Sequence, residues 1–231
     1  MLEGLLYVVS TPIGNLEDIT YRAIKVLNSV DLILCEDTRR TKVLCQKYGI
    51  SSPLKSYYSY IEYRRVEEIV PYIKQGKKVA LVSDSGTPGI SDPGYLIIKS
   101  CIENNIKVVS VPGAVAFVAA AVVSGCQLSK IIFLGFLPKK IGKIEKTILE
   151  VSIEGSTIIF YESPKRLVKT LEILLKVLIQ KKVFCVIVRE LTKVYEEFIR
   201  GSLQEVYDKL KDRKVKGEIV VLLNIEKDEK N

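Results

Sequence analysis

The stretch Val79-Ala80-Leu81-Val82-Ser83-Asp84-Ser85-Gly86-Thr87-Pro88-Gly89-Ile90-Ser91-Asp92-Pro93-Gly94 joins a short apolar run to a long polar loop. The apolar run predicts a buried strand. The twelve-residue loop, 83–94, contains three glycines, two prolines and two aspartates, whereas about 2–6 residues usually connect a strand to a helix. This length and composition favour a binding loop over a simple turn.

Short apolar runs and amphipathic segments alternate on both sides of this loop. Strands are expected at 5–10, 31–35, 79–83 and 107–111, with helices at 16–28, 38–48, 61–75 and 94–104. Asp18 or Thr20 is the expected cap of the first helix, and Thr38 that of the second. Such alternation predicts βαβ units and a mostly parallel sheet.

The second half of the chain has a different order and spacing of predicted strands and helices. Strands are expected at 131–136, 157–161, 184–189, 194–200 and 218–225, with helices at 143–151, 165–179 and 202–211. Two of these strands follow each other closely, which predicts a mixed sheet with an antiparallel portion. We therefore expect two α/β/α domains, an N-terminal one at 1–115 and a C-terminal one at 116–231.

Composition excludes several classes of chemistry. The chain has 231 residues, 35 Lys+Arg against 27 Asp+Glu (net charge +8), and no histidine, so a histidine relay or a histidine metal site is impossible. Its five cysteines form no CxxC pair, and we expect reduced thiols and no metal. The longest apolar run, 114–123, is too short to cross a membrane. A cytoplasmic protein is expected, and the charge is compatible with a nucleic-acid partner.

Three loops rich in Gly and Pro follow predicted strands in the first half: Thr11-Pro12-Ile13-Gly14-Asn15, the 83–94 loop, and Pro112-Gly113-Ala114-Val115. The carboxyl ends of strands in an open α/β sheet form the ligand crevice. None of the loops matches GxGxxG or GxxxxGK[ST], which disfavours a dinucleotide site or a P-loop. Asp84 is placed to hold a ribose diol or a ligand ammonium, or else caps a helix.

Charged residues mark further strand ends. They occur in Cys35-Glu36-Asp37-Thr38-Arg39-Arg40, Tyr161-Glu162-Ser163-Pro164-Lys165-Arg166, Arg189-Glu190-Leu191-Thr192-Lys193 and Lys216-Gly217-Glu218. The first of these is either a substrate-binding segment or a helix start, although arginines there oppose the helix dipole. Lys139 and Lys140 follow a predicted strand and are the best candidates for RNA contact. The tyrosines at 57, 58, 60 and 63 either stack bases or form a half-buried aromatic surface.

In this order, the segments Tyr7–Leu16 with Asp18-Ile19-Thr20, Cys35–Arg39, 83–94, Phe160–Ser163, Arg189–Lys193 and Lys216–Glu218 resemble a known family. They are similar to the small-subunit ribosomal RNA methyltransferases of the tetrapyrrole-methylase superfamily. Those enzymes use S-adenosylmethionine. The resemblance covers nearly the whole chain.

The resemblance implies two α/β domains with the methyl donor in the cleft between them, and a homodimer. It implies 2′-O-methylation of a cytidine in small-subunit (16S) ribosomal RNA, with that RNA or the 30S subunit as partner. It places S-adenosylmethionine on Pro12, Gly14, Asp84, Ser85, Gly86, Thr87, Pro112, Gly113, Ala114, Val115, Tyr161, Glu162, Gly217 and Glu218. It directs Glu36, Asp37 and Arg39 towards the substrate, with Arg189, Glu190 and Lys193 nearby.

Family members often carry a His-Asn-Glu element where this chain reads Ser59-Tyr60-Ile61-Glu62. Because the chain has no histidine, acid–base chemistry falls to Asp, Glu, Lys, Tyr, Cys or a water. The candidates for the base that activates a ribose hydroxyl are Glu36, Asp37, Glu190 and a neutral lysine such as Lys193. We expect Asp37 or Glu36 to act as base or orienting group, with Arg39 on a phosphate.

Two rival functions remain open at the level of sequence. One is methylation of a tetrapyrrole precursor, although those enzymes usually show Gly-Asp-Pro where this chain has Ser83-Asp84-Ser85-Gly86-Thr87-Pro88. The other is RNA binding without chemistry.

Overall fold

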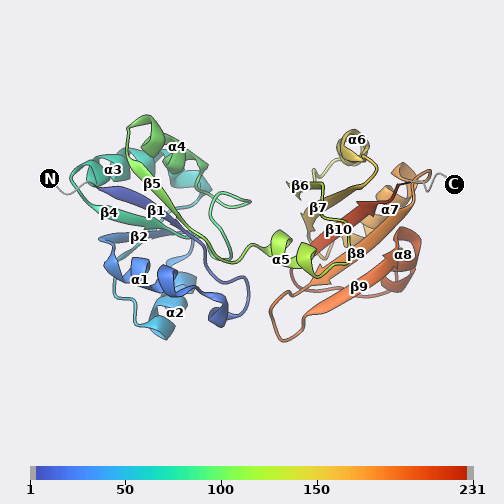
Figure 1. Ribbon diagram of the computed structural model, residues 1–231, viewed down its shortest axis with the longest axis horizontal. Helices are drawn as coiled ribbons and strands as arrows, with labels where there is room; N and C mark the ends of the chain where they lie inside the picture. Colours follow the sequence, from blue (N-terminus) through green and yellow to red (C-terminus); the bar gives the residue numbers. More distant parts are fainter. Residues whose placement is uncertain (1–3, 228–231) are drawn as a thin grey trace. The chain divides into compact units, whose positions relative to one another are not determined.

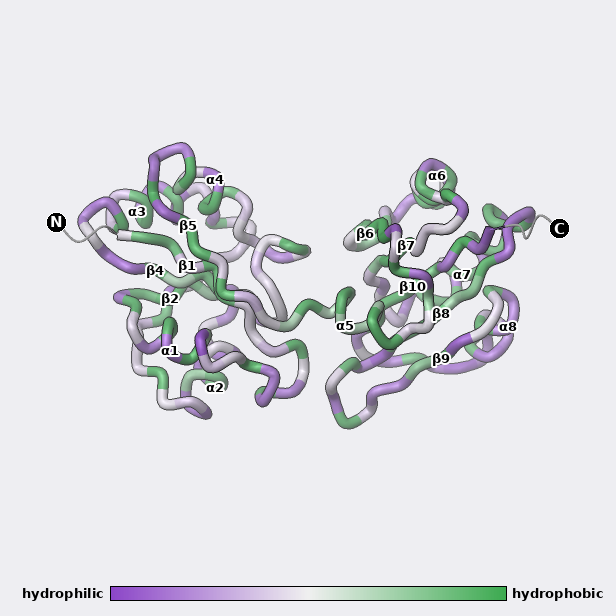
Figure 2. The backbone as a smooth tube through the Cα atoms, in the orientation of Figure 1, coloured by the Kyte–Doolittle hydropathy of each residue, from purple (hydrophilic) through white to green (hydrophobic). Residues whose placement is uncertain are grey.

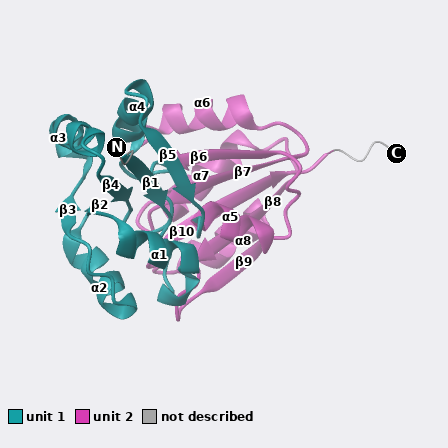
Figure 3. Ribbon diagram, turned by 60° about the vertical axis from the view of Figure 1, so that its left-hand side comes forward, with its two compact units in different colours: residues 1–115 teal, residues 116–231 magenta. Residues whose placement is uncertain are grey.

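The computed structural model describes residues 4–227 and contains two five-stranded sheets, one in each of two compact units. The boundary between the units lies between Val115 and Ala116. Figure 3 shows unit 1 in teal and unit 2 in magenta.

Unit 1 alternates strands with helices (Figure 1). Its elements are β1 (Leu5–Val9), η1 (Leu16–Asp18), α1 (Tyr21–Ser29), β2 (Leu32–Cys35), α2 (Thr38–Tyr48), β3 (Leu54–Ser56), η2 (Ser59–Ile61), α3 (Glu62–Lys74), β4 (Lys78–Leu81), α4 (Tyr95–Glu103) and β5 (Lys107–Val111). The strand order is β3-β2-β4-β1-β5, and every pair is parallel. The predicted parallel sheet is confirmed.

Helices cover both faces of this sheet. On one face, Leu6 and Leu81 pack in a buried cluster with Ile69 of α3 and Ile97 of α4. On the other face, Val9, Ile33 and Val82 pack with Ala23 and Leu27 of α1 and Cys45 of α2. Burial on both faces explains why the strands of this unit are almost continuously apolar.

Unit 2 is built around a mixed sheet. Its elements are α5 (Ala116–Val122), β6 (Ile131–Phe136), α6 (Ile141–Val151), β7 (Ser156–Glu162), α7 (Leu167–Val177), β8 (Val183–Arg189), β9 (Glu197–Ser202), α8 (Leu203–Leu210) and β10 (Ile219–Ile225). The order is β6-β7-β10-β8-β9. Only the β6–β7 pair is parallel, which confirms the predicted mixed sheet.

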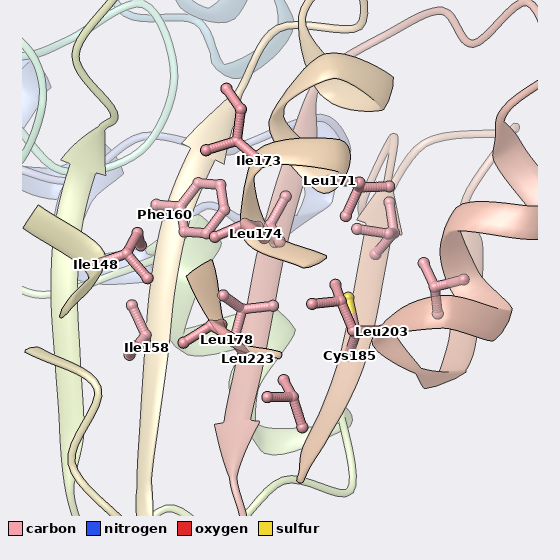
Figure 4. Packing of buried hydrophobic residues seen from close by; sticks show 14 of the residues in the cluster. Ile148, Ile158, Phe160, Leu171, Ile173, Leu174, Leu178, Cys185, Leu203 and Leu223 are labelled. Atoms are coloured by element: carbon pink, nitrogen blue, oxygen red, sulfur yellow. The ribbon is translucent and has the colours of Figure 1, made fainter. Parts of the chain in front are cut away.

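The main core of unit 2 lies beneath α6, α7 and α8 (Figure 4). Phe160 of β7, Cys185 of β8 and Leu223 of β10 point into it and meet Leu171 and Leu174 of α7. The opposite face of the sheet is covered by Ala120 and Ala121 of α5. Figure 2 shows that the central strands of both sheets are hydrophobic along most of their length.

Several local predictions were wrong. The expected helix at 16–28 is divided into η1 and α1, because Thr20 caps α1 by accepting a hydrogen bond from the Ala23 N–H (3.1 Å). Asp37, not Thr38, caps α2. The strand expected at 194–200 begins only at Glu197, after a turn in which Glu190 and Thr192 have positive φ angles. The elements β3 and α5 were not predicted.

Candidate functional site

The strand order of unit 1 brings four of the predicted loops together. Neighbours in the order β2-β4-β1-β5 are hydrogen-bonded and parallel, so their carboxyl ends lie along one edge of the sheet. The loops that follow these strands are, in the same order, 36–37, 83–94, 10–15 and 112–115. Three loops assigned to the methyl donor are thus adjacent to the loop assigned to the substrate.

Hydrogen bonds join the three donor-side loops at Thr87. The hydroxyls of Thr87 and Ser10 share a hydrogen bond of 2.7 Å, and the Thr87 hydroxyl also donates to the Ala114 carbonyl (3.1 Å). Thr11 adds to this link, because its backbone N–H and its hydroxyl both donate to the Gly86 carbonyl (2.8 and 3.2 Å). Ser10 and Thr11 were not predicted as site residues, although Thr11 begins the first predicted loop and Ser10 ends the strand expected before it.

Gly113 is required by the close approach of two of these loops. A Cβ atom at this position would lie 2.9 Å from the Cβ of Ser10 and 3.5 Å from the Ser10 carbonyl oxygen. Real Cβ atoms almost never come so close, so a side chain here would push the loops apart. The family resemblance assigns this glycine to the methyl donor, and the close packing gives it a structural function as well.

The loops after β2 and β4 are fastened by reciprocal contacts. The Asp84 carboxylate accepts from the Asp37 backbone N–H (3.0 Å), and the Glu36 carboxylate accepts from the Asp84 backbone N–H (3.4 Å). Arg40 adds an ion pair to Asp84 at 3.4 Å. Asp84 therefore fastens the end of β2 in two ways: its carboxylate holds the Asp37 backbone, and its backbone N–H holds the Glu36 carboxylate.

The two acids at the end of β2 have opposite electrostatic environments. Burial, together with the negative charges of Asp92 and Asp84, raises the pKa of Glu36 to about 6. Hydrogen bonds from the Arg39 side chain and backbone lower the pKa of Asp37 to about 2. Asp37 accepts from Arg39 N, Nε and Nη2 at 2.8, 3.0 and 2.7 Å. Glu36 is thus the better proton acceptor near neutral pH, and Asp37 orders the helix start.

Two acids that were not predicted as site residues lie close to this edge. Burial raises the pKa of Asp92, and the charge of Asp84 adds to that effect. Glu62 accepts from the Tyr57 hydroxyl (2.8 Å) and from the Gly94 N–H (3.0 Å), so it fixes the end of the 83–94 loop. Asp92 belongs to the predicted 83–94 loop itself, whereas Glu62 is 32 positions from Gly94, so the sequence does not indicate that contact.

The donor-side loops have a chemistry that suits S-adenosylmethionine. Gly14, Pro112 and Gly113 are exposed, Ser85 and Ala114 are half-buried, and these small residues leave backbone amides and carbonyls within reach of a ligand. Pro12, Gly86 and Pro88 are buried and hold the loop backbones. Backbone polar groups beside small side chains fit a ligand with a purine, a ribose and an amino-acid group.

In unit 2, Glu162 organises the segment that carries two predicted RNA-binding lysines. Its buried carboxylate accepts from Ser163 N (2.7 Å) and from the Thr170 hydroxyl (2.7 Å), and lies 3.5 Å from Arg166. Arg166 in turn donates to the carbonyls of Leu137 and Pro138, at 3.3 and 2.7 Å. These contacts fix the backbone that leads to Lys139 and Lys140, both exposed. The predicted contact between Glu162 and the donor stays a prediction.

Tyr161 packs between two aromatic neighbours in unit 2. Its ring makes an edge-on contact with Phe133, at a centroid distance of 5.2 Å, and a tilted contact with Phe136 at 5.5 Å. Phe136 is 61% exposed.

Of the four tyrosines at positions 57–63 in unit 1, Tyr57 is fully buried, whereas Tyr58, Tyr60 and Tyr63 are exposed. The tyrosine group is thus divided between the core and the surface.

The charged residues after β8 and before β10 form one network. Lys193 makes ion pairs with Glu190 (3.0 Å) and Glu218 (2.8 Å), and the Glu218 N–H donates to Glu190 (2.8 Å). The hydrogen bond from the Glu218 backbone lowers the pKa of Glu190. Burial alone would lower the pKa of Lys193, but its hydrogen bonds to Glu218 and Glu190 outweigh this effect and raise it. Neither Glu190 nor Lys193 is thereby suited to act as the base.

Gly217 allows this network to close. Its φ angle is +95°, and a Cβ atom here would lie 2.6 Å from the side chain of Glu190. Arg189 is held separately, because it contacts Glu197 at 2.9 Å, and Glu197 also binds Arg213 at 2.6 Å. Three of the predicted substrate residues of unit 2, Arg189, Glu190 and Lys193, are therefore fixed by ion pairs.

Metal sites, membrane-spanning helices and disulfides were each searched for among the described residues. Over residues 4–227, no group of three His, Cys, Asp or Glu side chains is arranged to hold a metal ion. Across the same residues, no helix is long and apolar enough to span a membrane. All five cysteines are free thiols, and four of them are buried.

The sequence and the fold were compared with those of known proteins. The family model described as Tetrapyrrole (Corrin/Porphyrin) Methylases matches residues 5–207. A protein of Thermotoga maritima named Ribosomal RNA small subunit methyltransferase I is 49% identical over 96% of this chain and 98% of its own. The protein of the same name from Bacillus subtilis is 43% identical over 95% of this chain and 75% of its own.

Solved structures share the fold at low sequence identity. The methyltransferase CobJ superposes with a TM-score of 0.70 at 18% identity, covering 96% of this chain and 94% of its own. The uroporphyrin-III C-methyl transferase of Thermus thermophilus, solved as a complex with S-adenosyl homocysteine, gives 0.68 at 16% identity, covering 96% and 97%. These likenesses show the fold alone, whereas the sequence relatives carry the assignment. The chain belongs to the tetrapyrrole methylase family and, within it, to the group of ribosomal RNA small subunit methyltransferase I.

Proposed function

We propose that this protein transfers a methyl group from S-adenosylmethionine to the 2′-oxygen of a cytidine ribose in small-subunit ribosomal RNA. The single observation that carries the proposal is the 49% identity over 96% of the chain to a relative named as a small-subunit ribosomal RNA methyltransferase. The loops of unit 1 that are joined at Thr87 support it, because their small side chains leave backbone polar groups within reach of such a donor. The proposed substrate belongs to the ribosome, which places the activity in the cytoplasm.

S-Adenosylmethionine supplies an electrophilic methyl group on a sulfonium sulfur, so no metal is needed to activate it. The protein must then hold the acceptor oxygen in line with that methyl group and exclude water. The loops joined at Thr87 are held together by the protein's own hydrogen bonds, which reduces the ordering required on binding. Tyr161, Glu162, Gly217 and Glu218 in unit 2 stay predicted donor contacts.

Glu36 is proposed as the base. A ribose hydroxyl is a weak nucleophile, and its proton must leave as the new carbon–oxygen bond forms. A pKa of about 6 keeps the Glu36 carboxylate ionised near neutral pH while making it a stronger proton acceptor than an ordinary carboxylate. Asp37 is proposed to orient Arg39, whose side chain is 89% exposed and available to a phosphate.

The active form is proposed to be a homodimer, as the resemblance implied. Val118 and Val122 lie one helical turn apart on α5 and are 46% and 66% exposed. Exposed apolar side chains at this spacing suit a protein contact. Sedimentation of the purified protein tests this point, and a monomer at all concentrations would contradict it.

The decisive experiment is methyl transfer from radiolabelled S-adenosylmethionine to small ribosomal subunits from cells that lack this protein. We expect label in the RNA and, after alkaline hydrolysis, an alkali-resistant dinucleotide that contains 2′-O-methylcytidine. Glu36→Gln is expected to lose about 10²-fold or more in kcat while S-adenosylmethionine still binds in calorimetry. Label in uroporphyrinogen and none in RNA would instead support a tetrapyrrole methylase.

A further inference from the structure

A groove of about 530 Å³ lies on the surface of unit 1, beside α2 and the segment that leads into β3. Its lining includes Thr38 and Arg39 at the start of α2, Lys42 and Gln46 further along that helix, and Ile50 and Leu54 on the opposite side. The donor-side loops contribute none of these residues. The groove is therefore a feature separate from the loops joined at Thr87.

The charge of the groove is one-sided. The eleven residues of α2, TRRTKVLCQKY, include four basic side chains and no acidic one. Of these, Arg39 and Lys42 line the groove, and both are exposed. Arg39 donates to Asp37 through Nε and Nη2, which leaves its second terminal nitrogen available to an anion. Helix α2 thus presents two cations to whatever enters the groove.

The opposite wall is apolar. Ile50 is buried at 7% exposure and Leu54 is half-buried, so they present little but hydrocarbon to the groove. Thr38 and Gln46 add a hydroxyl and an amide on the α2 side. A lining that combines two cations, two aliphatic side chains and neutral hydrogen-bonding groups matches the phosphate, base and sugar of a nucleotide.

The position of the groove relates it to the proposed reaction. It begins at Thr38, two residues after Glu36, on the helix that follows β2. A polynucleotide whose reactive ribose lies at Glu36 would therefore run along α2 on one side. This step rests on the proposed function, since Glu36 marks the position of the methylated ribose only if that function is correct.

We infer that the groove between α2 and residues 50–54 binds a nucleotide of the ribosomal RNA next to the methylated one. Arg39 and Lys42 bind its phosphate, and its base lies against Ile50 and Leu54. The residues assigned to the base are aliphatic, and the described lining has no aromatic ring, so the contact is expected to be insensitive to the identity of the base. Its contribution is affinity and register along the RNA.

The test compares matched pairs of variants in binding to purified small ribosomal subunits, measured over a range of salt concentrations. Lys42→Gln removes a cation that lines the groove, whereas Lys47→Gln removes one from the same helix outside the lining. Gln46→Glu places a negative charge in the groove, whereas Gln75→Glu makes the same exchange at the exposed end of α3.

We expect Lys42→Gln and Gln46→Glu to weaken subunit binding by about tenfold, with Lys42→Gln reducing the slope of log K against log salt by about 1. The Lys47 and Gln75 variants are expected to stay within about twofold of the unchanged protein, because neither site lines the groove. In steady-state kinetics the two groove variants should raise KM for the subunit and keep kcat. Thermal melting and S-adenosylmethionine binding should be unchanged in all four.

Equal binding by the groove variants and their controls would overturn the inference, even if the protein methylates RNA. Failure of the proposed function would look different: the unchanged protein would bind S-adenosylmethionine and transfer no methyl group to the subunit. The binding comparison can still be made in that case, so the two failures are distinguishable. If the Lys42→Gln variant has a lowered melting temperature, the comparison of subunit binding by Gln46→Glu and Gln75→Glu is the test of the inference.

Discussion

Glu36 is the residue whose surroundings bear most directly on the proposed reaction. Burial and the neighbouring charges of Asp92 and Asp84 raise its pKa to about 6, and a base acts only when deprotonated. We therefore expect kcat/KM to fall about tenfold per pH unit below pH 6. Asp92→Asn removes one of the repelling charges and should move this acidic limb to lower pH. If the acidic limb of the pH profile of the unchanged protein has its midpoint near the ordinary pKa of glutamate, the assignment of Glu36 as the base is wrong.

The same raised pKa has a consequence for stability. Between the unfolded value of 4.5 and the folded value of about 6, the folded protein binds more protons at Glu36 than the unfolded chain does, so this residue's contribution to stability declines as pH rises through that window. Glu36→Gln removes the ionised form. We expect its melting temperature relative to that of the unchanged protein to be higher at pH 7.5 than at pH 5. A difference that is independent of pH would show that the carboxyl is not perturbed.

Gly217 gives a second test at the level of one residue. Alanine there needs a positive φ angle and displaces the side chain of Glu190, so Gly217→Ala is expected to lower the free energy of unfolding by about 1–3 kcal/mol. Gly142, within α6, has open space around the position of a Cβ atom. Gly142→Ala should raise stability by up to about 1 kcal/mol. Urea unfolding of both variants measures the contrast, and equal effects would refute the argument from close packing.

Helix α3 covers one face of the sheet and also holds the end of the 83–94 loop. Its first residue, Glu62, accepts hydrogen bonds from the fully buried Tyr57 and from Gly94 at the end of the long loop. Glu62→Ala leaves both donors without this acceptor, and we expect a loss of about 1–3 kcal/mol in stability, with faster hydrogen exchange at the Gly94 amide. Glu67→Ala, at an exposed position of the same helix, should change stability by less than about 0.5 kcal/mol. Unchanged exchange at Gly94 in the Glu62 variant would show that the loop is held by other contacts.

The elements also show how far a sequence can be interpreted. Strands buried on both faces, such as β4, form apolar runs that are easily recognised, whereas β3 is a three-residue edge strand, Leu54-Lys55-Ser56, without any such run. Helix α5 is composed of Ala, Val and Phe, so it shows no polar face and no helical period. The four loops of the candidate site could be predicted because Gly, Pro and charged residues mark the ends of their strands. The hydrogen bond from the Asp84 backbone N–H to the Glu36 carboxylate could not be predicted, because it joins residues 48 positions apart.

At the scale of the whole molecule, each unit has its own buried clusters of hydrophobic residues. Those of unit 1 are drawn from residues 6–111, and those of unit 2 from residues 116–225. We propose that 1–115 and 116–231 are independent domains. Each segment, expressed alone, should give an α/β circular dichroism spectrum and a cooperative thermal transition. A segment that remains unfolded alone but folds when the other is added would contradict their independence.

The strand order of the two sheets has a consequence for how the protein is synthesised. The first strand to be made, β1, lies between β4 and β5, so one of its edges stays unpaired until residue 81 has been translated and the other until residue 111. At roughly 5–20 residues per second, the longer wait lasts about 5–20 s. In the second sheet the order is reversed, because β10, the last strand to be made, lies between β7 and β8. Unit 1 can therefore complete its sheet on the translating ribosome while unit 2 still lacks its central strand, and an aggregation-prone apolar strand edge is exposed in each unit in turn.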